Sequence, residues 1–427
     1  MVMKKNIYIT VFFALSYYNS LAQKVRSCAN EFCDSVAKTS DAQYLIRKMR
    51  YEQALENEVN LRKNFRVAAE IIRIPVVVHV IHNQVNGQIA GSNIPDEQIY
   101  SQIKVLNEDY RKKVGTLGFN TNPVGADTEI EFFLANIDPS GNPTSGIKRV
   151  YSSRASFNIV NDNDRLAMSN LSYWDSNKYL NMWVAPLSSG YIGYGEFPYS
   201  ESVEGLDIDS DERTDGVFID YTTFGKKSGT NQSGIYSFGR TVTHEVGHWM
   251  GLYHTWGDER CGTDYVADTP AATTSNSSSF CRDVFSNCTG TRTRNMIENY
   301  MDYSPDSCMN IFTEGQKQRM RAALDLSKRR KRVLNYAKFQ LPPSTSLQVN
   351  FENPLPLTNP QFQILLPDFQ DFTIVIRDIF GRIVYNQAYV DLPSTVITLP
   401  KGNITPGVYI LSVSSNQQLI QKKLVFY

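Results

Sequence analysis

The chain has 427 residues, a length that suggests two or three domains rather than one. Its 43 basic and 43 acidic residues cancel, so the net charge predicts neither a nucleic-acid partner nor attraction to an acidic membrane surface. Hydrophobic residues form 41% of the chain, which is enough apolar material for a core.

The N-terminus has the pattern of a secretory signal peptide. Two lysines precede a largely apolar run from Ile7 to Tyr18, and Ser20-Leu21-Ala22 is a small-x-small cleavage signal. We therefore expect a signal peptide over residues 1–22, and a first buried strand or a short membrane anchor is the alternative. The sequence has no second apolar run of about 18 residues, so no transmembrane helix is expected. Export would make disulfide bonds plausible for the six cysteines.

A polar, charged segment follows, which we interpret as a pro-segment over residues 23–66. Its stretch from Asp41 to Arg62 contains no glycine or proline, which favours a helix. This helix lacks a sustained apolar pattern, so the segment is a poor candidate for a core of its own.

Residues 67–335 have the pattern of a mixed α/β domain. The β-branched run from Ile71 to Ile81 predicts a buried strand, and Pro95-Asp96-Glu97 begins a helix. His79 and His82 are interpreted as ordinary strand residues. Further strands are expected at residues 130–136, 180–185 and 216–221, and further helices at residues 239–253 and 313–335.

The last of these helices ends in a basic run, Lys328 to Arg332. We interpret this run as a solvated helix end, and an exposed processing site is the alternative. After it the composition changes. Leu341-Pro342-Pro343-Ser344 is typical of a linker, which we assign to residues 336–345.

Residues 346–427 predict a small all-β sandwich, so the fold class of the whole chain is α+β. Short alternating segments are separated there by turns such as Phe380-Gly381. The expected strands lie at residues 372–377, 382–386, 395–399, 407–413 and 419–426.

Three of the five histidines lie within twelve residues, THEVGHWMGLYH. His244 and His248 are spaced i, i+4, which places both imidazoles on one face of a helix. Glu245 lies beside them, and Gly251 allows the chain to leave the helix so that His254 can return to the same metal. Three histidine ligands leave a fourth position for water, which is typical of a catalytic zinc site.

The extended pattern His-Glu-x-x-His-x-x-Gly-x-x-His resembles the signature of the metzincin metalloproteases. The later stretch ENYMDYSPDSCMNIFTEGQKQRM resembles the pappalysin branch of that group, and the similarity covers residues 71–335. The resemblance implies a twisted mixed sheet with backing and active-site helices. It also implies that His244, His248 and His254 bind zinc.

The same resemblance implies roles for four further residues. Glu245 would be the general base and then the proton shuttle, acting on a zinc-bound water. Met301 would form the hydrophobic floor under the metal, and Tyr303 would stabilise the developing oxyanion. Asp306 would line the pocket for the residue just after the scissile bond and favour arginine, or sometimes lysine, there.

Four cysteines follow the histidines, and four cysteines allow three pairings. Cys261 to Cys288 and Cys281 to Cys308 span equal distances, and the pappalysin resemblance favours these two pairs. Other pairings or free thiols are the alternative.

The loop between these cysteines is rich in oxygen ligands, which suits calcium. Bacterial members of the pappalysin branch bind calcium in the matching loop. The resemblance therefore makes Asp264, Asp268 and Thr269 candidate ligands, with an exposed turn as the alternative.

Arg26-Ser27-Cys28 resembles the pro-segment of pappalysin-type enzymes, in which a cysteine after an arginine caps the zinc. Cys28 would then hold the enzyme latent until a cut near Arg66 or Arg73 releases the active domain. Ala29 stands where glycine is usual in that family. A disulfide between Cys28 and Cys33 is the alternative, and it would abolish the switch.

The C-terminal module resembles the type IX sorting domains of Bacteroidetes, through VIRDIFGRIV, PGVYILSV and QKKLVF. The resemblance implies passage through the periplasm and across the outer membrane by the type IX machinery. A secreted adhesion module is the alternative for this part.

We therefore expect a secreted zinc metalloendopeptidase that acts on proteins and peptides, binds zinc and calcium, and is a monomer. Two other classes remain open. One is a non-cleaving adhesin that carries zinc, and the other is an amidase that acts on cell-wall peptides.

Overall fold

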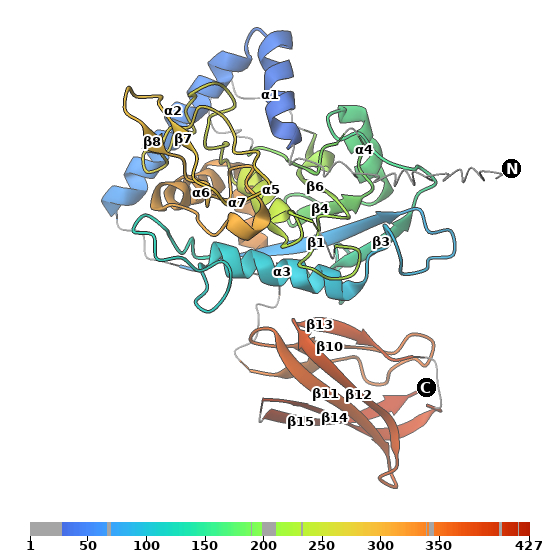
Figure 1. Ribbon diagram of the computed structural model, residues 1–427. Coiled ribbons are helices and arrows are strands. Elements are labelled where there is room, and N and C mark those ends of the chain that lie inside the picture. The colour runs from blue at the N-terminus through green and yellow to red at the C-terminus, as the bar shows by residue number, and fades with distance from the viewer. Residues whose placement is uncertain are drawn as a thin grey trace, which may run out of the picture.

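The computed structural model describes residues 28–65, 70–188, 190–198, 211–231, 234–338, 340, 346–400, 404–416 and 418–427. The expected signal peptide, Arg66 and the LPPS stretch of the expected linker lie outside the described residues. An α/β domain lies above a separate β domain (Figure 1). Among the described residues, no helix is long and apolar enough to cross a membrane.

The centre of the α/β domain is a six-stranded sheet in the order β2-β1-β4-β6-β5, with β3 also beside β1. Parallel pairing joins all of these strands except β5, which is antiparallel to β6. The β-branched first run forms the long strand β1, which pairs with β2 along one half and β3 along the other. The strands are β1 (Ile72–His82), β2 (Ile130–Leu134), β3 (Ile147–Tyr151), β4 (Leu180–Ala185), β5 (Gly193–Gly195) and β6 (Gly216–Asp220).

Two helices pack against this sheet and position the histidines. Helix α3 (Asp96–Tyr110) carries Ile99, Ile103 and Leu106 into the core, where they meet Val242 and Val246 of α5 (Arg240–Trp249). Helix α5 is buried along its whole length, so its polar residues must find partners inside the protein. Helix α4 (Asp162–Leu171) and the 3-10 turns η1 (Glu212–Thr214) and η2 (Asp306–Cys308) complete the framework.

The helix expected over residues 313–335 is two helices, α6 (Glu314–Leu326) and α7 (Lys328–Ala337). Thr313 and Gln316 form a capping box that begins α6. Ser327 interrupts the run because its backbone is extended, with φ −77° and ψ 113°.

The interpretation of the basic run as a solvated helix end is only partly correct, because Lys328, Lys331 and Arg332 are exposed but the run forms the start of α7 and two of its arginines point inward. Arg329 and Arg330 are buried, and both guanidinium groups pair with Asp215 at 2.7 and 2.6 Å. The Trp249 indole donates to the same carboxylate at 3.0 Å, and Arg330 donates to the Trp249 carbonyl at 3.1 Å. The arginines therefore fix the C-terminal end of α5, and this geometry does not favour a processing site either.

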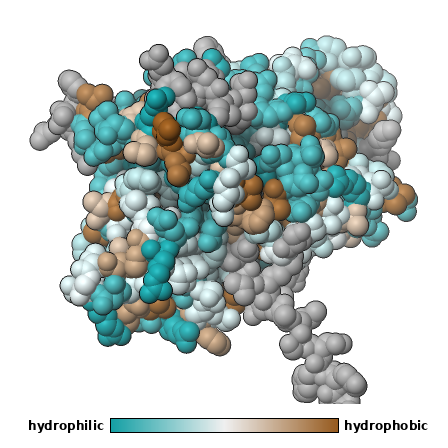
Figure 2. Space-filling view, turned by 90° about the horizontal axis from the view of Figure 1, so that it is seen from above, coloured by the Kyte–Doolittle hydropathy of each residue, from teal (hydrophilic) through white to brown (hydrophobic). Residues whose placement is uncertain are grey.

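The expected pro-segment forms two helices, α1 (Ala29–Ser40) and α2 (Tyr44–Phe65). The sequence predicted α2 but not α1. Seen from above, the face on which the pro-segment lies is largely hydrophilic, with scattered apolar patches (Figure 2). Arg73, one of the two expected cleavage points, lies inside β1 and pairs with Glu131. Proteolysis at Arg73 would require the hydrogen bonds of β1 to break first, so we expect the cut to fall before Glu70 instead.

The C-terminal domain consists of two antiparallel sheets, in the orders β13-β10-β9 and β12-β11-β14-β15, as expected of a sandwich. Residues such as Ile374, Leu411 and Phe426 fill the space between them. The strands are β9 (Gln348–Asn350), β10 (Gln361–Leu365), β11 (Gln370–Asp378), β12 (Ile383–Leu392), β13 (Thr395–Thr398), β14 (Gly407–Ser415) and β15 (Gln418–Phe426). The sequence did not predict β9 and β10.

Candidate active site

The three histidines of the motif converge on one point. His244 and His248 lie one turn apart on α5, and the chain then turns sharply at Gly251, whose φ of +86° is a left-handed conformation that favours glycine. This turn returns His254 to the same face. The three Nε2 atoms lie 3.1–3.2 Å from one another, and all three side chains are fully buried.

The hydrogen bonds of two of the rings show which nitrogen carries the proton. His244 Nδ1 lies 2.7 Å from the Tyr300 carbonyl oxygen, and His248 Nδ1 lies 2.7 Å from the Leu252 carbonyl oxygen. A carbonyl oxygen cannot donate, so each of these two Nδ1 atoms carries the proton and each Nε2 presents a lone pair to the cluster. Burial, with the neighbouring His254, lowers the pKa of His248 to about 3, so its ring is neutral at pH 7.

Three converging lone pairs repel unless a cation lies between them, and the spacing fits zinc. Nitrogens at 2.0–2.1 Å from a tetrahedral ion lie about 3.3 Å apart, close to the observed separation. Cys28 Sγ joins the three nitrogens in one buried group whose ligand atoms all lie within 4.8 Å of one another. The donor set therefore suits a soft-to-borderline cation.

Asp258 is a residue of the site that the sequence reasoning missed. Its carboxylate accepts the Nδ1–H of His254, and its side chain is only 4% exposed. Burial raises the pKa of Asp258, but His254 more than offsets this, so the net shift is downward. The only signal in the sequence is an acidic residue four positions after the last histidine.

Met301 lies directly under α5. A side-chain carbon on Gly247 would come within 2.5 Å of the Met301 sulfur, so the helix can approach this closely only because residue 247 is glycine. Asn299 holds the turn, since its side-chain oxygen accepts the Met301 N–H at 2.9 Å and its amide exchanges hydrogen bonds with Gln316. Met301 therefore lies close to the helix that carries His244 and His248.

Cys28 occupies the open side of the three histidines. Its thiol donates to Glu245 Oε2 at 3.2 Å, and its backbone N–H donates to the Tyr303 hydroxyl at 3.3 Å. Burial, with the Glu245 charge, raises the pKa of the Cys28 thiol well above its usual range. Cys28 and Cys33 are both free cysteines, so the alternative disulfide between them is absent from this structure.

Asn30 ties the start of α1 to the edge strand β5. Its side-chain amide donates to the Gly195 carbonyl at 2.6 Å and accepts the Gly195 N–H at 3.0 Å. The start of the expected pro-segment thus contacts the histidine cluster, Glu245, Tyr303 and the sheet edge together.

Asp306 lies away from open space. It is fully buried, and its Oδ2 accepts the backbone N–H groups of Phe238 and Arg240 at 3.0 and 3.1 Å. Its carboxylate therefore caps the N-terminal end of α5, where a negative charge is favourable. In this pro-segment-bound structure Asp306 is not an exposed pocket wall.

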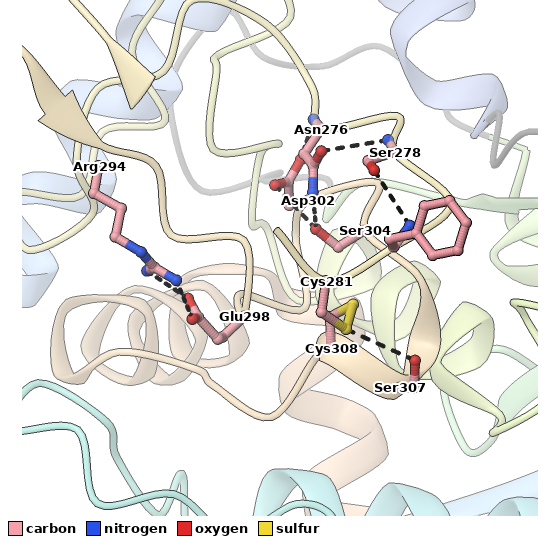
Figure 3. The surroundings of a disulfide bond; sticks show 10 residues. Asn276, Ser278, Cys281, Arg294, Glu298, Asp302, Ser304, Ser307 and Cys308 are labelled. Carbon is pink, nitrogen blue, oxygen red and sulfur yellow. Dashed lines mark hydrogen bonds and ion pairs between the residues drawn. A yellow bond between two sulfur atoms is a disulfide. The ribbon is translucent and has the colours of Figure 1, made fainter. Parts of the chain in front are cut away.

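Two disulfides join Cys261 to Cys288 and Cys281 to Cys308, the pairing that the resemblance implied. The second disulfide lies beside the turn that carries Tyr303 (Figure 3). Asn276 lies on the loop that the disulfides hold. Its backbone N–H donates to the Asp302 carboxylate at 2.9 Å, and its side-chain amide donates to the Ser304 hydroxyl at 2.7 Å. The disulfide-linked loop therefore supports this turn through side-chain contacts as well.

The expected calcium ligands have protein partners in the structure. Asp264 is buried and accepts the Thr269 hydroxyl at 2.7 Å, and burial raises its pKa to about 6. Asp268 accepts the Thr313 hydroxyl at 2.6 Å and the Gly315 N–H at 2.9 Å, which caps α6. Among the described residues, neither aspartate belongs to a group of three or more acidic, cysteine or histidine ligands.

Two family descriptions match separate parts of the chain. Residues 163–325 match the peptidase family described as pregnancy-associated plasma protein-A. Residues 353–427 match the secretion system C-terminal sorting domain. The first range contains all three histidines and both disulfides, and the second covers most of the β domain.

Fungal relatives match the chain over most of their own length. An extracellular metalloprotease of Colletotrichum graminicola is 34% identical over 254 residues, which is 59% of this chain and 76% of that protein. An extracellular metalloprotease of Neurospora crassa is 30% identical over 274 residues, which is 64% of this chain and 82% of that protein.

Solved structures of a bacterial protease have the same fold. A mutant of Tannerella forsythia promirolysin is 36% identical, with a TM-score of 0.62, and the match covers 74% of this chain and all of that one. Mature mirolysin in complex with a cleaved peptide is 39% identical, with a TM-score of 0.55 over 64% of this chain. The chain belongs to the pappalysin family and is a secreted zinc metalloendopeptidase with a C-terminal sorting domain of the type IX secretion system.

Proposed function

We propose that His244, His248 and His254 hold the catalytic zinc and that Glu245 is the general base of peptide hydrolysis. The observation that carries this proposal is the convergence of three buried Nε2 atoms beside a buried carboxylate. A scaffold protein would need the histidines but not the glutamate. The geometry therefore favours an enzyme over the zinc-bearing adhesin.

Zinc, when bound, supplies a Lewis acid that polarises the scissile carbonyl and lowers the pKa of water. Glu245 takes the proton of the attacking water and then delivers it to the leaving amine. Tyr303 donates its hydroxyl to the oxyanion that develops on the carbonyl. In the structure that hydroxyl accepts the Cys28 N–H, so the pro-segment lies against Tyr303 and must move away for a substrate to take its place.

We propose that Asp306 makes the enzyme prefer substrates with arginine, or lysine, just after the scissile bond. The position of Asp306 supports this, because its buried carboxylate lies next to the active-site turn, between η2 and the start of α5. Because Asp306 also caps α5, the test must keep its hydrogen bonds. Asp306→Asn keeps one acceptor oxygen but removes the charge, and we expect it to lower the preference for arginine by at least about tenfold, which is 1.4 kcal/mol.

Latency through Cys28 is the regulatory part of the proposal. Removal of the first 22 residues, then of a pro-segment ending near residue 66, would leave a peptidase domain over residues 67–335, a linker over residues 336–345 and the sorting domain over residues 346–427. Calcium in the 264–269 loop stays a prediction, since the protein groups that now contact Asp264 and Asp268 would have to share those carboxylates with the ion.

A cleavage profile tests the proposal. The chain, freed of its pro-segment, is incubated with a mixed peptide library and with cell-wall peptides, with and without a zinc chelator. We expect cuts in the library before arginine that the chelator abolishes. Cuts confined to cell-wall peptides would favour the amidase, and a folded, zinc-loaded chain that cuts neither would favour the binding protein.

A further inference from the structure

The pro-segment has a second attachment to the enzyme, far along the chain from Cys28. Helix α2 lies along α6, as Figure 1 shows, and its Tyr51 and Leu55 pack on Ala322 and Ala323. All four side chains are buried, with Leu55 at 1% exposure and both alanines at 0%. The small side chains on α6 let the larger residues of α2 approach closely.

A buried ion pair lies at the centre of this contact. The Glu52 carboxylate on α2 accepts hydrogen bonds from both terminal nitrogens, Nη1 and Nη2, of Arg319 on α6, at 2.7 and 2.8 Å. The two side chains are only 8% and 5% exposed. Arg62 and Asp325 form a further ion pair toward the ends of the same helices. A bidentate pair of this kind sets the register of two helices, because a shift along the axis breaks both hydrogen bonds.

The contact is also connected to the metal site. The third nitrogen of Arg319, Nε, donates to the carbonyl of Gly251 at 2.7 Å. Gly251 is the turn that returns His254 to the cluster, and its own N–H donates to the His248 carbonyl at 2.8 Å. Arg319 thus touches both the pro-segment and the backbone between two of the histidines.

The two helices of the pro-segment are joined to each other as well. Asp34 of α1 pairs with Lys48 of α2 at 3.0 Å, and Lys48 lies over the Tyr253 ring at 4.4 Å. An attachment of α2 on α6 therefore holds α1, and with it Cys28, against the histidines.

We propose that the face of α6 formed by Arg319, Ala322 and Ala323 is a binding site for α2 that retains the pro-segment after the chain is cut before Glu70. The retained fragment, held by Glu52 and its apolar neighbours, inhibits the enzyme without a covalent link. This inference rests on the proposed latency, but in it the cut pro-segment stays bound through α6 rather than through the Cys28 thiol.

The test uses the full chain with Glu245→Ala, so that no self-cleavage occurs. A recognition sequence for a site-specific protease is inserted between Phe65 and Glu70. After the cut, size-exclusion chromatography at micromolar concentration separates bound from free fragment, and mass spectrometry identifies the fragment in each peak. Because mass is the readout, failure of the peptidase proposal would not change the result.

We expect the parent fragment to co-elute with the enzyme, and Cys28→Ser to leave that co-elution intact. Glu52→Gln leaves Arg319 without its carboxylate in the complex, so we expect binding weaker by at least about a hundredfold and separate elution. Glu56→Gln is the matched control, because Glu56 lies one turn further on α2 and is exposed. Circular dichroism and the elution volume of each uncut chain verify folding.

Two outcomes would overturn the inference. One is release of the parent fragment, or release caused by Cys28→Ser alone, which would make the thiol the anchor. The other is a Glu52→Gln fragment that stays bound as firmly as the Glu56→Gln fragment. In that case the apolar contacts would hold α2 without the ion pair.

Discussion

Asp258 lies outside the histidine motif, but its carboxylate orients one of the three histidine rings. It accepts the Nδ1–H of His254 and so fixes both the orientation of that ring and the position of its free lone pair. The other two histidines are oriented by backbone carbonyls, which no substitution can remove. Of the three histidines, His254 is therefore the one whose orientation depends on a side chain.

Replacement of Asp258 by asparagine should weaken zinc binding. A carboxylate behind a ligand histidine raises its basicity, and loss of such a partner typically costs about 10–100-fold in metal affinity. Competition against a chromophoric chelator measures this, in a Cys28→Ala chain so that the thiol does not contribute. Glu259→Gln, an exposed neighbour, is the control and should be unchanged. Equal zinc affinity in both variants would show that Asp258 does not orient His254.

At the scale of elements, β1 carries a buried histidine that makes the fold sensitive to acid. His79 is fully buried, stacked on Trp183, with its ring nitrogens 2.7 Å from the Ser172 hydroxyl and 2.8 Å from Asn181. Burial lowers the pKa of His79 from 6.5 to about 4, despite the hydrogen bond to Asn181. Between these two pKa values, His79 is neutral in the folded protein and protonated in the unfolded chain.

The sign of the effect follows from this difference. Below pH 6.5 the unfolded chain binds a proton at residue 79, and the folded chain does so only near pH 4, so stability falls across this window as the pH is lowered. The full loss is about 3 kcal/mol. His79→Gln removes this contribution, so its thermal midpoint should change less than that of the parent between pH 7 and pH 4.5. Parallel curves for the two chains would refute the assignment.

The sequence predicted the elements whose pattern is local. The run from Ile71 to Ile81 is rich in β-branched residues, and the histidine spacing can be read directly on a helix, so β1 and α5 were predictable. Strands β3 and β5 were not, because β5 is only three residues long and β3 is largely unburied, and each depends on its neighbour in the sheet. The basic run was partly misread because its partner, Asp215, lies more than a hundred residues earlier.

For the candidate site as well, only the residues that belong to a local sequence pattern could be predicted. The motif contains the three histidines and Glu245, and all four side chains are buried together. The helix that delivers Cys28 begins in a segment with no sustained apolar pattern, since α1 is stabilised by contacts such as that of Asn30 with Gly195. Likewise, the packing of Asp306 against the start of α5 depends on long-range backbone contacts that no spacing reveals.

For the whole molecule, the pro-segment and the enzyme form one interlocked unit. Cys28 covers the histidines, and α2 lies on α6 with its own buried contacts. Cys28→Ala in the uncut chain should raise peptidase activity by at least about tenfold, since a lost metal contact exceeds 1.4 kcal/mol. The activity should stay below that of a chain freed of residues 28–65, because α2 still holds α1 over the cleft. Hydrolysis of a fluorogenic peptide measures all three chains.

A result at either extreme would contradict this view. Equal latency of Cys28→Ala and the parent would show that the thiol is not needed. Full activity in the uncut variant would show that α1 and α2 do not cover the site once the thiol is gone.

The most direct measurement of the central claim compares zinc content with peptide hydrolysis in the same preparations. The chain freed of its pro-segment and its Glu245→Ala variant are analysed side by side for bound zinc, by elemental analysis, and for cleavage of an arginine-containing peptide. We expect equal zinc in both and a loss of hydrolysis of at least about a hundredfold in the variant, within the usual range for a general base. Near-parent hydrolysis by a zinc-loaded Glu245→Ala chain would contradict the proposed mechanism.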